Sequence, residues 1–345
     1  MKTVSNKEIS RACTKLRENP KDIQPYNKIN AWRALHATPL VRFRTNLHIY
    51  KKERKKWMMV SQRLKRMPTI VSKISRFPKM QLHRMQDIGG IRAVVENMSE
   101  LRALQKNFVN KKSSFSFKLV KETDYTQNRP IKDTGYRGLH HIYKYKQQSD
   151  GNDLSIEFQI RTKLQHLWAN AIETVDIIEE DDDKLKFGQI SYNNKEKNEI
   201  FSLISSLFSL VEKTKTLKEH ENKDQITIIE EINKKEKSIH ILDKLNRLIQ
   251  ITESTNIKVS KNTKYCIIKS NIETKQTEIK EYSEENFEEA NNEYIEIEKK
   301  ALESGDANKI IAVLVSADKV RESYRGYFFD TRDFLNEIKQ LGVIF

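Results

Sequence analysis

The chain has 345 residues, of which 32% are charged, and a formal net charge of +15. This length predicts a sizeable core and more than one domain, while the distant Cys13 and Cys266 exclude a disulfide framework and a cysteine metal site. No run approaches 18 uncharged apolar residues, and the first ten residues lack the apolar segment of a signal peptide. We therefore expect a soluble, cytoplasmic protein without membrane contact.

The positive charge is concentrated in the first half of the chain. Residues 1–170 hold 36 Lys and Arg against 13 Asp and Glu, a balance of +23, which leaves −8 for the remainder. Within residues 36–92, 15 basic residues accompany only two acids, Glu53 and Asp87. This polarity predicts that the first half meets a polyanion, whether a nucleotide, a phosphate or RNA.

Helices are predicted over the first 80 residues. Ser5 and Glu8 have the spacing of a capping box, so a first helix should begin there and end at Pro20. Three further helices are expected: from near Pro25 to a break at "ATPL" (37–40), over the basic residues 46–66, and from Pro68 to Phe77.

From residue 91 to residue 176 the pattern changes to a mixture of strands and helices. Strands are predicted at 91–96, 115–120, 140–146 and 155–160, and helices at 98–109 and 162–176. A strand, a helix and then several strands indicate a mixed sheet with helices packed on it.

The second half is predicted to be rich in helices. Residues 198–213 place five apolar side chains on one helical face, namely Phe201, Ile204, Leu207, Phe208 and Val211. A long helical region follows over 226–251. The tail then predicts strands at 264–269, 276–282 and 310–316, and helices at 284–303 and 330–341.

Two polar segments could bind a polyphosphate and its metal ion. "RLKRMPTIVSK" supplies Arg63, Lys65 and Lys73, cations of the kind that neutralise and position phosphate oxygens. In "MQDIGGIRAVVE", Asp87 and two glycines precede a strand that contains Arg92, an arrangement that suits a hard cation facing phosphates. The alternatives are a solvated basic face and an ordinary turn aspartate.

Two later segments could hold the second substrate. In "KDTGYRGLHHIY", Tyr136 lies between two glycines and can present its ring to a flat base, unless it belongs to a plain surface hairpin. In "SIEFQIRT", period two places Glu157, Gln159 and Arg161 on one strand face, which could also serve solubility alone. Zinc is disfavoured, because the adjacent His140 and His141 must point to opposite faces of a strand.

Together, "RLKRMPTIVSK", "DIGGIR", "KDTGYRGLH" and "EFQIRTKLQHLWA" resemble the synthetase domain of the RelA/SpoT alarmone enzymes, over roughly residues 60–178. The resemblance implies an α+β fold with a nucleotidyltransferase-like mixed β-sheet flanked by helices. It also implies transfer of the β,γ-pyrophosphate of ATP to the 3′-hydroxyl of an acceptor ribose, with release of AMP. The sequence has no His-Asp dipeptide and so lacks the family's hydrolase motif.

Together with the change to acidic, helix-rich sequence near residue 180, the predicted elements and the resemblance give four expected regions. They are a basic helical region (1–58), a RelA/SpoT-like nucleotidyltransferase domain (59–180), a helical extension (181–255) and a small C-terminal α/β domain (256–345). The N-terminal "INAWRALHATPL" and the tail "AVLVSADKVRESYRGYFFDTRDF" are similar to a longer branch of these proteins. The oligomeric state stays open.

The resemblance also implies roles for individual residues. Asp87 and Glu157 are expected to be catalytic and to hold Mg²⁺, the expected cofactor, and Glu157 alternatively activates the 3′-hydroxyl. ATP would be bound by Arg63, Lys65, Lys73 and Arg92. The acceptor would be bound by Lys132, Tyr136, His140, Gln159, Arg161 and His166; Tyr136 would stack on the base, and His166 stands where many members have an asparagine that contacts guanine.

Several functions remain open at this stage. The first prediction is a pyrophosphokinase that makes (p)ppGpp from ATP and GDP or GTP. The alternatives are a toxic relative that modifies the 3′ end of tRNA, gripped by the basic run at 42–56, or one that makes adenosine alarmones. A third possibility is a non-catalytic RNA-binding or sensor protein that has kept the fold.

Overall fold

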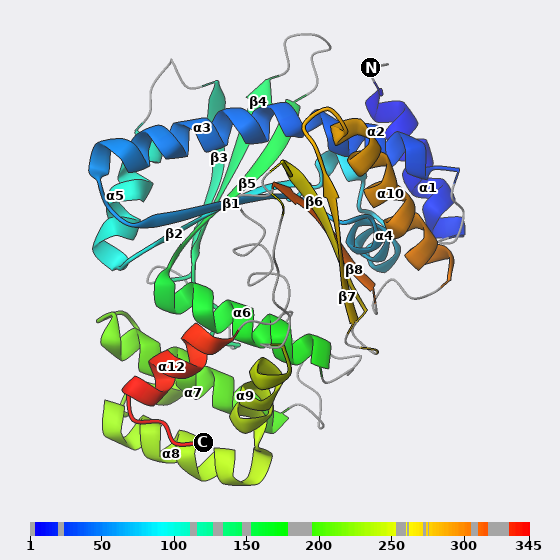
Figure 1. Ribbon diagram of the computed structural model, residues 1–345. Coiled ribbons are helices and arrows are strands. Elements are labelled where there is room, and N and C mark those ends of the chain that lie inside the picture. The colour runs from blue at the N-terminus through cyan, green and yellow to red at the C-terminus, as the bar shows by residue number, and fades with distance from the viewer. Residues whose placement is uncertain are drawn as a thin grey trace. The chain divides into compact units, whose positions relative to one another are not determined.

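The computed structural model describes most of the chain in two compact units (Figure 1). The first unit comprises Met1–Thr123, Leu139–Thr162 and Ile297–Asn308, and the second Asp124–Gly138, Lys163–Glu296 and Lys309–Phe345. The described residues are 4–19, 24–110, 116–126, 134–146, 153–178, 195–252, 260, 262–271, 274, 276–304, 310–316 and 331–345.

A five-stranded mixed sheet forms the centre of the first unit. Its strands are β1 (Met58–Leu64), β2 (Gly89–Val95), β3 (Phe117–Asp124), β4 (Leu139–Lys146) and β5 (Asp153–Thr162). They are ordered β1-β2-β5-β4-β3, and β2 and β5 run parallel, whereas β1 is antiparallel to β2 and β4 to β5. The predicted mixed sheet, and with it the α+β class, is confirmed.

One face of this sheet is apolar and is covered by α3 (Ala37–Arg54) and α5 (Met98–Val109), as Figure 1 shows. Alternate strand residues point into this layer, where Phe43 of α3 lies 5.0 Å from Phe158 of β5 between ring centroids. The same core contains Leu47, Ile91, Leu104, Phe108, Tyr143, Ile156 and Ile160. The other face of the strands is therefore free to carry polar side chains.

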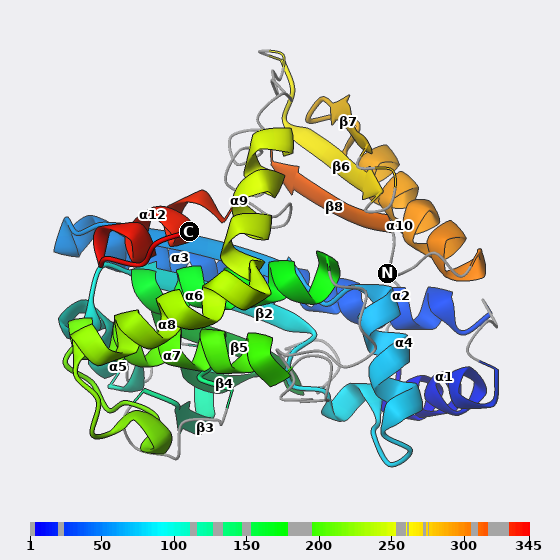
Figure 2. The ribbon, with the colours of Figure 1, turned by 90° about the horizontal axis from the view of Figure 1, so that it is seen from below.

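A second core of the first unit lies among α1 (Asn6–Glu18), α2 (Tyr26–Leu35), α4 (Met67–Arg76) and the short η1 (Leu82–Arg84) (Figure 2). The predicted capping box of α1 is present, since the Glu8 backbone N–H donates to Ser5 Oγ (3.3 Å) and the Ser5 N–H donates to Glu8 Oε2 (3.0 Å). Pro68 lies in the first turn of α4, as predicted.

The region between residues 37 and 66 differs from the prediction. The helix expected from near Pro25 ends at Leu35, before "ATPL", as predicted. "ATPL" itself forms the first turn of α3, because a proline there removes only an N–H that has no intrahelical partner. Met58–Leu64 is strand β1 and not part of a basic helix. Met58 and Val60 are buried and every residue of β1 pairs with β2, so tertiary pairing overrides the helical preference of this stretch.

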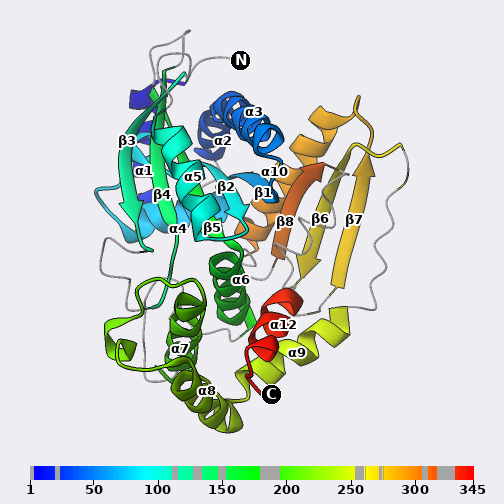
Figure 3. The ribbon, with the colours of Figure 1, turned by 90° about the vertical axis from the view of Figure 1, so that its left-hand side faces the viewer.

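The second unit is built mainly from helices, which Figure 3 shows lying together: α6 (Lys163–Ile178), α7 (Lys195–Val211), α8 (Gln225–Ile239), α9 (Ile241–Thr252) and α12 (Arg332–Gln340). Most of the predicted apolar face of α7 is confirmed as buried, but Val211 at its end is 41% exposed. The helical region predicted over 226–251 is divided at His240, whose φ of 52° is left-handed. The short η3 (Lys218–His220) joins α7 to α8.

The tail contributes a small antiparallel sheet to the second unit. Strands β6 (Tyr265–Asn271), β7 (Gln276–Tyr282) and β8 (Ile310–Ser316) are ordered β7-β6-β8, and α10 (Phe287–Glu303) follows β7. The hydroxyl of Tyr282 donates to Glu293 of α10 (2.8 Å). None of the helices in the described ranges combines the length and the apolar character needed to cross a membrane.

Candidate active site

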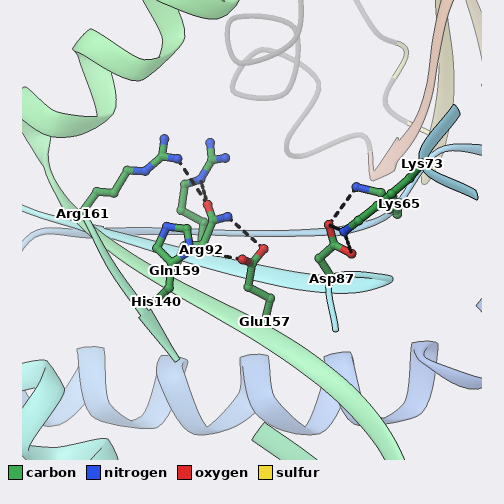
Figure 4. Close-up of polar contacts among 8 residues, drawn as sticks. All are labelled: Lys65, Lys73, Asp87, Arg92, His140, Glu157, Gln159 and Arg161. Atoms are coloured by element: carbon green, nitrogen blue, oxygen red, sulfur yellow. Dashed lines mark hydrogen bonds and ion pairs between the residues drawn. The ribbon is translucent and has the colours of Figure 1, made fainter. Parts of the chain in front are cut away.

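The polar residues of the first unit gather on the face of the sheet that α3 and α5 leave uncovered (Figure 4). In the strand register, Arg63 of β1 pairs with Gly90, and Gly90 pairs with Glu157 of β5. Two residues further along, Arg92 pairs with Gln159, which also pairs with His140 of β4. Because directly paired residues share a face, four strands deliver their polar side chains to one surface.

Glu157 lies at the centre of this surface and has a partner for each carboxylate oxygen. Oε1 lies 3.2 Å from His140 Nδ1, and Oε2 accepts a hydrogen bond from the Gln159 amide (2.9 Å). Burial by itself would raise the pKa of Glu157, but the hydrogen bond and charge of His140, with help from Arg63, outweigh it and hold this pKa below its usual value. Glu157 is therefore ionised at neutral pH.

Gln159 joins Glu157 to two arginines. Its amide oxygen accepts from Arg92 Nε (3.2 Å) and from Arg161 Nη2 (3.4 Å), and this arrangement points its amide nitrogen at Glu157. Gln159 and Arg161 are both buried, at 9% and 4% exposure. Since the amide cannot turn over without losing contacts on both sides, Gln159 fixes the orientation of the Glu157 carboxylate.

Asp87 lies just before β2 and is held by two lysines. Its Oδ2 accepts from Lys65 Nζ (2.9 Å), and Lys73 Nζ of α4 lies 3.1 Å from its Oδ1. Burial would raise the pKa of Asp87, but the charges and hydrogen bonds of Lys65 and Lys73 lower it overall. Asp87 is thus ionised, and it positions two cations beside the polar face (Figure 4).

The site carries an excess of positive charge. Five cationic side chains accompany the two carboxylates, namely Arg63, Lys65, Lys73, Arg92 and Arg161. Arg63 extends over Gly90, where a Cβ would lie 3.6 Å from Arg63 Cγ. A surface with three more cations than carboxylates attracts a polyanion such as a nucleoside triphosphate.

The two neighbouring histidines have separate surroundings, as predicted from strand geometry. His140 contacts Glu157 on the polar face, whereas His141 is fully buried on the covered face and its Nε2 lies 2.7 Å from Glu122 Oε2. In the described ranges, no three His, Cys, Asp or Glu side chains come together as metal ligands. His140 and His141 therefore cannot bind one zinc ion together, because their side chains lie on opposite faces of β4.

Asp87 and Glu157 nevertheless fit a magnesium ion that arrives with a nucleotide. Asp87 lies just before β2 and Glu157 lies on the neighbouring strand β5, and the charge of Asp87 acts on the pKa of Glu157. Both are ionised oxygen donors, the ligand type that Mg²⁺ prefers, and Mg²⁺ usually takes its other ligands from phosphates and water. Phosphate oxygens would compete with the Asp87 carboxylate for the ammonium groups of Lys65 and Lys73.

Other predicted acceptor residues belong to the second unit. The ring of Tyr136 packs against the helical core and lies 5.8 Å from that of Tyr125, nearly edge to face. His166 of α6 contacts Asn170, with 3.2 Å between His166 Nε2 and Asn170 Nδ2. Lys132 lies outside the described residues.

The sequence did not reveal one contact of the loop that carries Tyr136. Arg137, directly after Tyr136, is 3% exposed, and its Nε donates to Ser205 of α7 (3.1 Å). The available signal was a set of serines at helical spacing in α7, all of them buried: Ser202, Ser205, Ser206 and Ser209. An apolar packing face accounts for the aromatic residues of α7 but not for these hydroxyl groups.

Comparison with known protein families decides what kind of domain carries this surface. Residues 62–176 match the family model described as "Region found in RelA / SpoT proteins". These residues are a RelA/SpoT domain. The match begins within β1 and includes α4, β2, β4 and β5, the elements that carry the polar face. A search of curated proteins found no match to the chain.

Solved structures similar to the chain include three bacterial proteins. Small alarmone synthetase 1 from Bacillus subtilis is 19% identical, with 54% of this chain and 93% of that chain covered and a TM-score of 0.43. Small alarmone synthetase 2 from the same organism is 18% identical (53% and 94% covered, TM-score 0.44). A GTP pyrophosphokinase family protein from Streptococcus pneumoniae is 20% identical (57% and 94% covered, TM-score 0.43).

Proposed function

We propose that the RelA/SpoT domain transfers the β,γ-pyrophosphate of ATP to the 3′-hydroxyl of GDP or GTP. The observation that carries this proposal is the polar face itself, where an ionised Glu157 with two partners lies beside Asp87 and an excess of cations. Residues of the types that bind ATP, bind Mg²⁺ and orient an attacking hydroxyl group thus lie together on one sheet. The guanine acceptor follows from the resemblance of the four motifs to the RelA/SpoT synthetase domain.

In the proposed reaction, the ribose 3′-oxygen attacks the β-phosphorus of ATP, the bond from that phosphorus to the α,β-bridging oxygen breaks, and AMP leaves. Arg63, Lys65, Lys73 and Arg92 would bind the triphosphate and offset the charge that builds up on it. When bound between Asp87 and Glu157, Mg²⁺ would neutralise phosphate charge. Alignment of this kind can lower a barrier by about 7–11 kcal/mol.

Glu157 would orient the attacking hydroxyl. A carboxylate with a lowered pKa is a weak base, so it suits holding the hydroxyl proton and the metal better than removing a proton before attack. His140 and Gln159 would keep the carboxylate in place, and His140 with Arg63 would keep it ionised. Gln159 would act on the reaction through Glu157.

A transfer assay with ATP labelled at the γ-phosphate tests the acceptor. GDP, GTP, ADP, ATP and deacylated tRNA are offered separately with Mg²⁺, and products are separated by chromatography. We expect label on a guanine nucleotide together with AMP. Label on ADP or ATP alone would indicate an adenosine alarmone, and a lack of label on every acceptor would contradict transfer and favour a non-catalytic protein.

A second candidate acceptor is the 3′ end of tRNA. The outer side of α3 and the turn after it expose a row of cations, Arg42, Lys51, Lys52, Lys55 and Lys56, and Trp57 is 49% exposed. Cations with an aromatic ring suit an RNA backbone and its bases. Because α3 covers the face opposite Glu157, an RNA held there must also pass the edge of the sheet. Label on tRNA, lost steeply as salt rises, would favour this reading.

A further inference from the structure

Helix α7 lies outside residues 62–176, yet it contacts the loop that carries Tyr136. The hydroxyl of Ser205 donates to the carbonyl oxygen of Gly135 (2.5 Å) and accepts from Arg137 Nε (3.1 Å). One buried side chain thus holds the residue before Tyr136 and the residue after it. Both bonds lie within the second unit.

The fit between α7 and this loop depends on a glycine. Gly135 has a left-handed φ of 80°, and a Cβ added there would lie 2.7 Å from Ser205 Cβ and 3.4 Å from Trp168 Cζ2. The backbone of the loop therefore approaches α7 more closely than a side chain at this position would allow. The glycine at residue 135 thus permits direct packing of the loop on α7.

The buried guanidinium of Arg137 depends on the contact with Ser205 for a hydrogen bond. It is 3% exposed, and among the residues that the structure describes its Nη1 and Nη2 have no hydrogen-bond partner. Ser205 then supplies the hydrogen bond that holds the guanidinium, whose charge is otherwise opposed mainly by Glu212. Without the Ser205 hydroxyl, a buried cation would lose this bond, which favours movement of the loop toward water.

We propose that Ser205 is a positioning residue for the acceptor, because it holds Gly135 and Arg137 so that the Tyr136 ring is set to receive the acceptor base. This inference rests on the proposed function for the role of Tyr136. It adds a residue outside the RelA/SpoT domain to the determinants of acceptor binding. ATP binding, which is assigned to residues of the first unit, should be independent of it.

Helix α7 offers a matched control. Ser202 is as buried as Ser205, at 2% exposure each, but its hydroxyl donates to the carbonyl oxygen of Glu199 in the same helix (3.0 Å). Ser202→Ala therefore removes a buried hydroxyl from α7 and leaves the loop untouched. Any effect of Ser205→Ala that Ser202→Ala also shows belongs to the stability of the helix and not to the loop.

The test combines hydrogen exchange of the peptide around residues 134–139 with separate KM measurements for GDP and for ATP. Ser205→Ala should speed exchange of this peptide and raise the KM for GDP at least about tenfold, while the KM for ATP and kcat stay within about twofold. Ser202→Ala should change none of these quantities. A wild-type protein without transfer to GDP would overturn the proposed function, whereas identical exchange and KM values in the two variants would overturn the role of Ser205.

A double-mutant cycle covers the case in which Ser205→Ala folds poorly. If Ser205 acts by satisfying Arg137, adding Arg137→Met should remove the buried cation and restore the melting temperature of the Ser205→Ala protein. Strict additivity of the two substitutions in melting temperature and in loop exchange would overturn the coupling. Both readouts are independent of catalytic activity.

Discussion

Gln159 illustrates how one residue can set the chemistry of its neighbour. Its amide oxygen is held by Arg92 and Arg161, so its amide nitrogen faces Glu157. A carboxylate at this position would keep the arginine contacts but place negative charge against Glu157. The choice of an amide instead of an acid at residue 159 therefore influences how readily Glu157 is ionised.

Gln159→Glu should therefore raise the pKa of Glu157, which the wild-type surroundings hold below its usual value. Activity that needs ionised Glu157 is present above this pKa and is lost as the pH falls through it, so the acid limb of kcat should move to higher pH. A pH profile from 5 to 8 measures the shift. Gln105→Glu on α5, which also accepts from an arginine, is the control, and equal profiles for both variants would contradict the coupling.

Tyr136 is expected to stack on the acceptor base. A stacked base contributes about 1–3 kcal/mol, so Tyr136→Ala should weaken GDP binding by about tenfold or more and leave ATP binding nearly unchanged. Tyr136→Phe keeps the ring and should bind GDP almost normally. Separate calorimetric titrations of GDP and a non-hydrolysable ATP analogue measure both affinities. Parallel losses for the two nucleotides in Tyr136→Ala would contradict a role confined to the acceptor.

The residues on single strands could be placed from the sequence, but contacts between segments could not. Period two put Glu157, Gln159 and Arg161 on one face, as the structure has them. By contrast, the ion pairs of Asp87 with Lys65 and Lys73 join three separate segments. Whether Asp87 faces lysines or solvent depends on how α4 packs against the start of β2, which no local pattern reveals.

At the scale of elements, two adjacent glycines of β2 have different functions. A methyl group on Gly89 would lie 2.7 Å from Ile156 Cδ1 and 3.3 Å from His36 Cβ, whereas one on Gly90 would meet Arg63 Cγ at an ordinary 3.6 Å. Gly89 lets the junction of α2 and α3 pack on the sheet. Gly90 keeps the polar face open between Arg63 and Glu157.

We expect Gly89→Ala to lower the free energy of unfolding by about 1–3 kcal/mol through overpacking, and Gly90→Ala to leave it nearly unchanged. Denaturant titration of the two variants measures the difference. The adjacent substitution serves as the control, because both replace a strand glycine with alanine. Equal losses of stability would contradict the packing argument and point to a general intolerance of side chains in β2.

Helices and strands were predictable where the hydrophobic periodicity and the length of the segment indicated the same type of element. The helices at 98–109 and 162–176 and the strand at 155–160 follow from clear periodicity. β1 was missed because its residues, such as Gln62 and Arg63, prefer helices and only one of its ends is buried. The division of α8 from α9 at His240 was missed because a histidine there gives no turn signal.

At the scale of the whole molecule, His36 links folding to pH. It is 1% exposed, and its Nδ1 lies 3.0 Å from the carbonyl oxygen of Trp32. Burial lowers the pKa of His36 to about 4. As the pH falls, His36 is therefore protonated in the unfolded chain before it is protonated in the folded protein. The contribution of neutral His36 to the free energy of unfolding is fully present above about pH 6.5 and is lost between about pH 6.5 and pH 4.

Between pH 7 and pH 5, this group alone should reduce the free energy of unfolding by about 2 kcal/mol. His36→Asn keeps a donor to Trp32 but does not titrate, so its stability should fall less over the same interval. Urea titrations at both pH values measure the two slopes. The same pH dependence in wild type and variant would show that His36 does not control it.

The polar face of the sheet is proposed to perform the transfer, and the opposite face of the same sheet offers a control. Glu157 and Glu122 each contact a histidine, but Glu157 lies on the polar face with His140, while Glu122 meets His141 from the covered face. Glu157→Gln and Glu122→Gln are therefore the same chemical change on opposite sides of one sheet. Each removes a negative charge and keeps the shape of the side chain.

The most direct measurement is the rate at which AMP and 3′-pyrophosphorylated guanine nucleotide appear together from ATP and GDP, for wild type and both variants. For the wild-type and Glu122→Gln proteins, we predict that AMP and the pyrophosphorylated guanine nucleotide form in equal amounts and at similar rates. For Glu157→Gln, the rate of transfer should fall at least about a hundredfold, while ATP binding and the melting temperature are retained. Normal turnover by Glu157→Gln would contradict the account of this site.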